Sequence, residues 1–155
     1  MELSGKKGVG NILKIFLQVC FYGGIIVLIF LPFAFNALGL KLNSCMYVIY
    51  PNGIVMLLIT HKFIQLFNSL KNNNPFCEEN ITIQKSTAKL SIIEAILWFV
   101  DFLYSVVLVK SDDPVLILGL AFLSILFFGV SIALYILSEL FRKAYEYKEE
   151  NDLTI

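Results

Sequence analysis

Four long apolar runs, separated by short polar segments, dominate the pattern of this chain. A bilayer core about 30 Å thick is crossed by about 20 apolar residues in helical form. Each run meets that length, so the pattern predicts four membrane-spanning helices. They lie at about residues 15–35, 51–70, 90–109 and 115–137.

Flanking residues refine the first two spans. The first run follows Lys6 and Lys7, as a secretory signal peptide would, but its apolar stretch is too long and no clear cleavage site follows it. We therefore expect a retained helix. The second helix is expected to begin at Pro51, because proline is favoured in the first helical turn. Tyr47 and Tyr50 would then lie at the outer interface as amphipathic anchors.

The segments at 71–89 and 138–155 are expected to be helical in part. Three asparagines and a proline stop the second helix, and a new helix is expected to start near Cys77, with Glu78 and Glu79 at its positive end. In the tail, Leu140, Ala144 and Tyr147 recur on one helical side. The predicted fold is a single all-α domain, an integral membrane four-helix bundle with helical extensions before the third span and after the fourth.

Composition and charge placement agree with a membrane protein. The 155 residues are 58% hydrophobic and carry no net charge, so the charge total points to no nucleic acid or acidic partner. Ten of the twelve basic residues lie near the N-terminus, near the central segment or after the fourth run. Because cytoplasmic loops hold an excess of Lys and Arg, both termini and the central loop are predicted to be cytoplasmic.

Residues for metal or covalent chemistry are sparse. Cys20, Cys45 and Cys77 are three in number and spread along the chain, so no disulfide framework is expected. With His61 as the one histidine, no zinc site and no cofactor are expected. No nucleophile–base set accompanies them, and we predict that the chain is not an enzyme.

Polar residues inside the predicted spans are the strongest functional candidates. Five of them share one face of the third span, and three polar residues share a face of the second. We count the depth of each residue in the membrane from Leu70 in the second span and from Leu90 in the third. By this count three pairs lie at similar depths: His61 with Asp101, Gln65 with Glu94 and Asn68 with Ser91. Lys62, about 12 Å inside the second span, is expected to meet one of the acids. This predicted polar seam consists of His61, Lys62, Gln65, Asn68, Ser91, Glu94, Trp98, Asp101 and Ser105.

Two interpretations of the seam remain open. Intramembrane acids are costly and tend to be functional, which favours a proton-responsive or ligand-binding site. Polar side chains also hydrogen-bond across membrane helices simply to hold them together, at about 0.6–2 kcal/mol each. Small residues at Gly23–Gly24, and at Gly129 with Ala133, are expected to pack between helices within the bundle.

The central Asn74-Pro75-Phe76 followed by Cys77, two glutamates and Asn80, and the tail from Lys148 to Ile155, resemble a known family. The chain resembles the domain-of-unknown-function family numbered 2975, small bacterial four-helix membrane proteins. Their loops commonly carry Ser or Thr where this chain has Cys77. The resemblance implies no catalytic activity and a place in the bacterial cytoplasmic membrane. It also implies a partner class, because such proteins are often encoded beside a small helix-turn-helix regulator.

The tail is either a frayed terminus or a recognition element. We predict that the chain is a sensory or sequestering membrane partner of a small cytoplasmic DNA-binding regulator, with lipid as its surroundings and no direct contact with nucleic acid. The alternative is a small carrier built on the seam, which would require a homo-oligomer. The residues predicted to bind the partner are Pro75, Phe76, Glu149, Glu150, Asn151, Asp152, Leu153, Thr154 and Ile155.

Overall fold

The computed structural model describes residues 9–37, 42–70, 77–110 and 112–152. They form four long helices, α1 (Val9–Ala37), α2 (Leu42–Leu70), α3 (Glu78–Leu103) and α4 (Pro114–Asp152), and a short π-helical turn, η1 (Tyr104–Leu108). The all-α prediction is confirmed. Three helical stretches are long and apolar enough to cross a membrane: Asn11–Ala37, Glu78–Leu108 and Pro114–Glu150. In its described part, α2 does not join that set.

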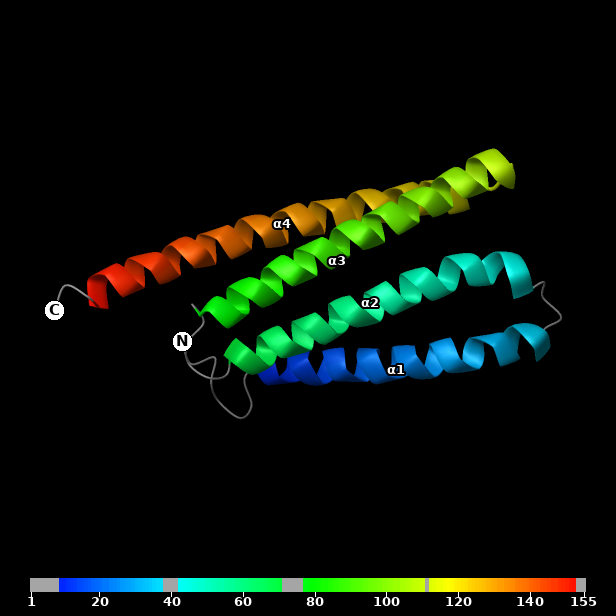
Figure 1. Ribbon diagram of the computed structural model, residues 1–155. Helices are drawn as coiled ribbons and strands as arrows, with labels where there is room; N and C mark the ends of the chain where they lie inside the picture. Colours follow the sequence, from blue (N-terminus) through cyan, green and yellow to red (C-terminus); the bar gives the residue numbers. More distant parts are fainter. Residues whose placement is uncertain (1–8, 38–41, 71–76, 111, 153–155) are drawn as a thin grey trace.

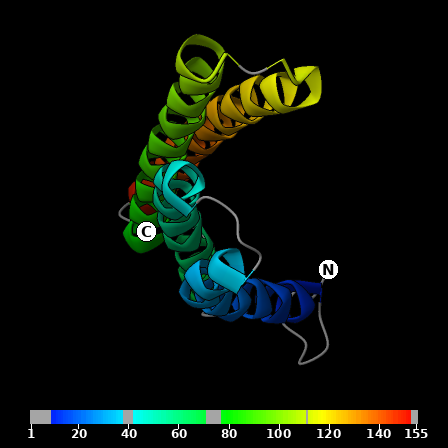
Figure 2. The same cartoon turned by 90° about the vertical axis from the view of Figure 1, so that its right-hand side faces the viewer.

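Consecutive helices run in alternating directions and contact one another in chain order, α1 with α2, α2 with α3 and α3 with α4 (Figure 1). The start of α1, the end of α2, the start of α3 and the end of α4 therefore lie at one end of the molecule. Seen along the helices, the row curves into an open crescent with α1 and α4 at its two ends (Figure 2).

Proline positions in α1 and α2 explain one contact between these helices. Pro32 lies inside α1 and has no N–H to donate, so the carbonyl of Leu28 loses its helical partner. The hydroxyl of Tyr50 in α2 donates to that carbonyl oxygen at 3.0 Å. Freed carbonyls inside a membrane need such a substitute donor. Pro51 also lies inside its helix, because α2 begins at Leu42 rather than at the proline.

Glycines allow α1 and α2 to approach closely. A Cβ atom on Gly24 would lie 2.9 Å from Leu57 Cδ2, and one on Gly53 would lie 2.7 Å from Leu28 Cδ2. Gly23, by contrast, faces open space. The expected glycine packing contact in the first span is therefore made by Gly24.

The residues that precede α3 and α4 differ in how they cap the start of the helix. Cys77 is extended before the first turn of α3 and makes no side-chain cap bond, although the Ile81 N–H donates to its carbonyl at 3.2 Å. Asp113 caps α4, since its Oδ1 accepts from the N–H of Val115 at 3.0 Å. From Pro114 the helix continues without a break through the predicted fourth span into the tail.

Burial in this molecule is reversed relative to a soluble protein. Large apolar side chains are exposed along every helix; Val115 is 78% exposed and Ile125 72%. Among the described residues, buried polar side chains outnumber buried apolar ones, and Gln84 and Glu94 are among the most enclosed. An apolar exterior of this extent is characteristic of a membrane protein whose helices contact lipid.

Candidate functional site

Most of the deeply buried polar residues lie on one face of α3. Their spacing alternates between three and four residues, which keeps them in line along the helix. The face, here called the polar face of α3, consists of Asn80, Gln84, Thr87, Ser91, Glu94, Trp98 and Asp101. It extends about three turns closer to the start of α3 than the predicted seam, which began at Ser91.

Hydroxyl groups on this face bond to their own helix. The Thr87 hydroxyl donates to the carbonyl of Ile83 at 2.8 Å, and the Ser91 hydroxyl donates to the carbonyl of Thr87 at 3.0 Å. Both side chains are almost completely buried. These bonds satisfy the two hydroxyl groups in an apolar environment, and they do not link α3 to another helix.

Asp101 provides the polar link between α2 and α3. Asn52 Nδ2 donates to Asp101 Oδ2 at 2.7 Å and also to the carbonyl of Val48 at 2.7 Å. Both residues are buried, and no hydrogen bond reaches Asn52 Oδ1 among the described residues. The hydrogen bond between Asn52 and Asp101, which are 49 positions apart in the chain, thus joins α2 to α3.

Glu94 is the most deeply buried acid of the described residues, at 1% exposed. Its Oε1 accepts from the indole Nε1 of Trp98 at 2.9 Å, one turn along the same helix. Its Oε2 has no hydrogen-bond partner in the part of the chain that the structure describes. A buried, incompletely bonded carboxyl group is costly, which distinguishes Glu94 from the satisfied hydroxyls beside it.

The polar residues of the predicted second span lie elsewhere. His61 is exposed and bonds to Gln65 Nε2 at 3.1 Å, with its ring 5.6 Å from that of Phe21 in α1. Lys62 donates to Gln65 Oε1 at 3.2 Å, and Asn68 is exposed. His61, Lys62 and Gln65 form a local cluster on α2. Among the described residues, no hydrogen bond or ion pair joins them or Asn68 to Glu94 or Asp101. Ser105 lies half-buried in η1.

The difference has a physical cause in the register of α2 and α3. The depth count began at Leu90, but α3 begins at Glu78, so residues 78–89 already run beside α2. Ser69 accordingly lies next to Cys77, with Oγ and Sγ 4.0 Å apart. Asp101 then lies opposite Asn52, about two and a half turns from His61.

Serines of α4 hold the third helix from its other side. Ser124 and Ser131, seven residues apart, donate to the carbonyls of Ala95 and Ala88 at 2.9 Å each. The two alanines are buried and small, which permits the close approach. Gly129 and Ala133 instead lie on the exposed surface of α4, and nothing lies within 4 Å of a Cβ placed on Gly129. Packing between the helices of this chain therefore uses the serines and not that pair.

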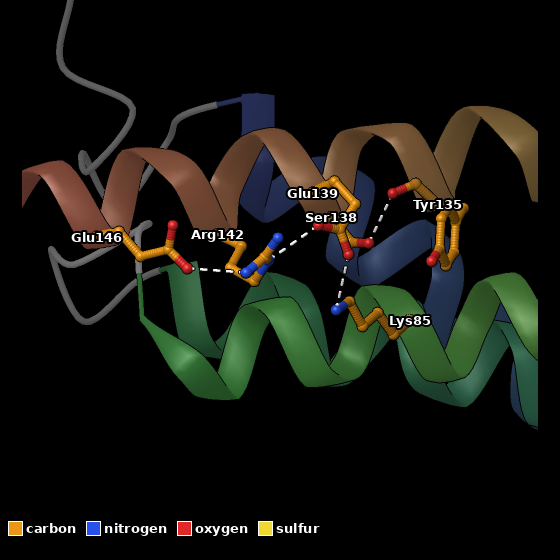
Figure 3. A network of polar contacts seen from close by, with 6 residues as sticks. All are labelled: Lys85, Tyr135, Ser138, Glu139, Arg142 and Glu146. Atoms are coloured by element: carbon orange, nitrogen blue, oxygen red, sulfur yellow. Dashed lines mark hydrogen bonds and ion pairs between the residues drawn. The ribbon is translucent and has the colours of Figure 1, made fainter.

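Beyond the predicted spans, charged residues link α3 to α4 (Figure 3). Glu139 accepts from Lys85 Nζ and from Arg142 Nε, each at 2.9 Å, and Arg142 Nη1 also reaches Glu146 Oε1 at 2.9 Å. The hydrogen bond from Lys85, followed by that from Arg142, lowers the pKa of Glu139 from its ordinary value of 4.5. We call these four residues the charged clasp. It fixes the extension of α4 to the start of α3.

Several of the residues predicted to bind a partner lie outside the described part of the chain. Pro75 and Phe76, and Leu153, Thr154 and Ile155, lie outside the described residues, and the side chains of Asn151 and Asp152 are likewise outside them. Glu149 is exposed and accepts from the Tyr145 hydroxyl at 3.1 Å, and Glu150 is exposed on the last turns of α4.

A model of one protein family matches residues 13–155, nearly the whole chain. The family is described as proteins of unknown function, DUF2975. The chain belongs to the DUF2975 family. No curated protein and no solved structure matches this DUF2975 chain. Membership fits the membrane-type helices and agrees with the resemblance found at the central Asn-Pro-Phe and at the tail.

Asn52 and the polar residues from Asn80 to Thr87 were not identified from the sequence. Tyr50 was expected as an interface anchor and not as a donor to the Leu28 carbonyl. A signal was present for the residues from Asn80 to Thr87, because the three–four spacing continues backward from Ser91 without interruption. Asn52 is a polar residue directly after a proline in an apolar run, which also marks it. The pairing of Tyr50 with the Leu28 carbonyl requires knowledge of the α1–α2 register, which no local pattern provides.

Proposed function

We propose that this protein is a non-enzymatic component of the bacterial cytoplasmic membrane that holds or releases a small cytoplasmic DNA-binding regulator. The family resemblance supports the partner class, through the helix-turn-helix regulators often encoded beside such proteins. The contact would be made by the central segment and the tail.

The observation that carries the proposal is an exposed apolar face on the extension of α4. Leu140 is 57% exposed and Tyr147 is 66% exposed. Their spacing of seven residues puts both on one side of the helix, with Ala144 between them. Charged residues flank this side. Apolar anchors at such spacing on a solvated helix are typical of recognition by a groove on a partner protein.

The charged clasp gives this face a connection to the membrane interior. α3 carries Glu94 and Asp101 on its polar face and Lys85 in the clasp, so one rigid helix joins both regions. A switch requires that the partner bind two states of the protein with different affinity. A signal that changes the contacts of α3 would shift the clasp, and with it the exposed face of α4.

Capture of the regulator from membranes tests the proposal. The full chain is co-expressed with a small helix-turn-helix regulator of the kind often encoded beside such proteins, and the detergent-solubilised membrane protein is purified by an N-terminal tag. We expect the regulator to co-purify, and the double substitution Leu140→Ser with Tyr147→Ser to reduce its recovery at least tenfold. Lys148→Ser changes an exposed residue of the same extension and serves as the matched control.

Deleting Asp152 to Ile155 tests whether the regulator is recognised by the exposed face of α4 or by the end of the chain. Loss of capture by the deletion alone would assign recognition to the tail tip. Failure of the intact chain to recover the regulator from membranes under any of these conditions would contradict the proposal.

A carrier remains the second candidate, and the burial of Glu94 with one unbonded oxygen favours it. The described helices form an open crescent rather than a closed ring, so we expect transport to need several copies. Proton-coupled uptake by proteoliposomes that is lost in Glu94→Gln would support this candidate over the first.

A further inference from the structure

An apolar groove is lined by residues of α3 and α4. Its volume is about 410 Å³. Small residues form its floor, because Ala95 and Ser124 meet where the serine hydroxyl donates to the alanine carbonyl. That bond uses the one polar side chain of the lining. The lining residues are Ile92, Ala95, Ile96, Phe99, Ser124, Ile125 and Phe128.

A positive charge lies at the end of the groove that faces the charged clasp. Lys85, Lys89, Ile92, Ile96 and Phe99 follow each other at four, three, four and three residues, so they form one line along α3. Lys85 is held by Glu139, whereas Lys89 is exposed and forms no ion pair among the described residues. The line is therefore cationic at one end and apolar along the rest.

We propose that this groove binds one anionic phospholipid, with an acyl chain between α3 and α4 and the headgroup phosphate at Lys89. From Lys89 to Phe99 the helix rises about 15 Å, which is the depth of one leaflet in a hydrocarbon core of about 30 Å. A lysine one turn below the clasp can extend its ammonium group to the headgroup level. The site takes its lipid from the leaflet on the side of the clasp.

A second copy of the chain fits the groove less well. Glu94 and Asp101, the acids of the predicted spans, are only 1% and 9% exposed, so in a neighbouring copy they could not pair with Lys89. An anionic headgroup supplies the missing countercharge directly. Basic residues near a membrane surface gain about 1 kcal/mol each from anionic lipid, a preference of about fivefold.

Trp98 is the only tryptophan of the chain, next to Phe99 and one turn after Ala95, and it serves as the reporter. The full-length protein is reconstituted in phosphatidylcholine vesicles that contain a minor fraction of brominated phosphatidylglycerol or, in parallel, brominated phosphatidylcholine. Bromine quenches tryptophan at short range, so Trp98, which does not itself line the groove, reports lipid bound beside its neighbours Ala95 and Phe99. We expect the anionic lipid to quench Trp98 with about fivefold higher relative affinity.

Substitutions assign the preference to Lys89. Lys89→Gln should reduce the ratio of the affinities for phosphatidylglycerol and phosphatidylcholine to about one. Lys89→Arg should keep the ratio of the unsubstituted protein. Lys143→Gln removes another exposed lysine, from the α4 extension, and should leave the preference for anionic lipid unchanged. Circular dichroism of each variant checks that the helices are retained, and native mass spectrometry of the unsubstituted protein counts bound phosphatidylglycerol independently.

Equal quenching by both lipids would overturn the proposal, as would a preference that survives in Lys89→Gln. A groove filled by a second copy would give equal quenching together with a dimer in the mass spectrum, which also overturns it. One retained phosphatidylglycerol per chain, lost in Lys89→Gln, would support it.

Discussion

At the scale of single residues, the hydrogen bond from Tyr50 to the Leu28 carbonyl compensates for the N–H that Pro32 lacks. Tyr50→Phe should therefore lower the free energy of unfolding in bicelles by about 1 kcal/mol. In a Pro32→Ala background the carbonyl regains a helical donor, so the same substitution should cost much less. Unfolding of the four proteins of this cycle measures the coupling.

Tyr22 supplies the control for that cycle, because it is 63% exposed on α1. Tyr22→Phe should leave stability unchanged. A loss from Tyr50→Phe that is equally large with and without Pro32 would show that the hydroxyl has another role.

The Asn52–Asp101 pair makes a second prediction at this scale. Asp101→Leu removes the acceptor and should destabilise the protein by about 1–2 kcal/mol, whereas Asp101→Asn keeps an acceptor and should stay close to the original stability. Regulator capture by the Asp101→Asn protein then decides between the two interpretations of the buried acids. Normal stability with altered capture indicates a signalling site, and normal capture indicates interhelical packing. Additive effects of Asn52→Leu and Asp101→Leu would contradict the pairing.

At the scale of elements, the charged clasp gives the α3–α4 pair a defined pH dependence. Folding lowers the pKa of Glu139 below 4.5, so the folded state favours the ionised carboxylate. The stabilisation is fully present above the unfolded pKa and is lost as pH falls through the lower folded pKa. Unfolding should thus become easier below about pH 4.5, and less steeply so in Glu139→Gln.

Other acids titrate in the same range, so the difference between the two proteins is the relevant quantity. Lys85→Gln removes the first donor and should give a weaker pH dependence than the unsubstituted chain. A Glu139→Gln profile that parallels the original at every pH would show that the clasp does not stabilise the pair.

The elements themselves could be predicted from the sequence, and their alignment could not. Run length gave four helices, and the acidic residues after Cys77 gave the start of α3. Polar periodicity identified Glu94 and Asp101 as members of one face. The partner of Asp101 depends on how far α3 runs beside α2, and this is fixed by the helical residues 78–89 that precede the predicted span. No pattern within α2 reveals that offset, so His61 was assigned in place of Asn52.

At the scale of the whole molecule, the predicted orientation is testable with the native cysteines. In the Cys20→Ser, Cys77→Ser protein, Cys45 should react with a membrane-impermeant maleimide in spheroplasts, because it lies at the predicted outer side. In the Cys20→Ser, Cys45→Ser protein, Cys77 should react only after lysis. The reversed pattern would place both ends of the chain outside.

α4 is a single helix of 39 residues, about 58 Å long, and it begins at the Asp113 cap and ends in the tail. A rod of that length acts as a lever arm. Tilting it by about 5° around its capped end displaces the far end by about 5 Å, the pitch of one helical turn. A tilt of this size is too small to open a passage through the membrane. It would still move Tyr147 far enough to change its contacts with a protein bound there.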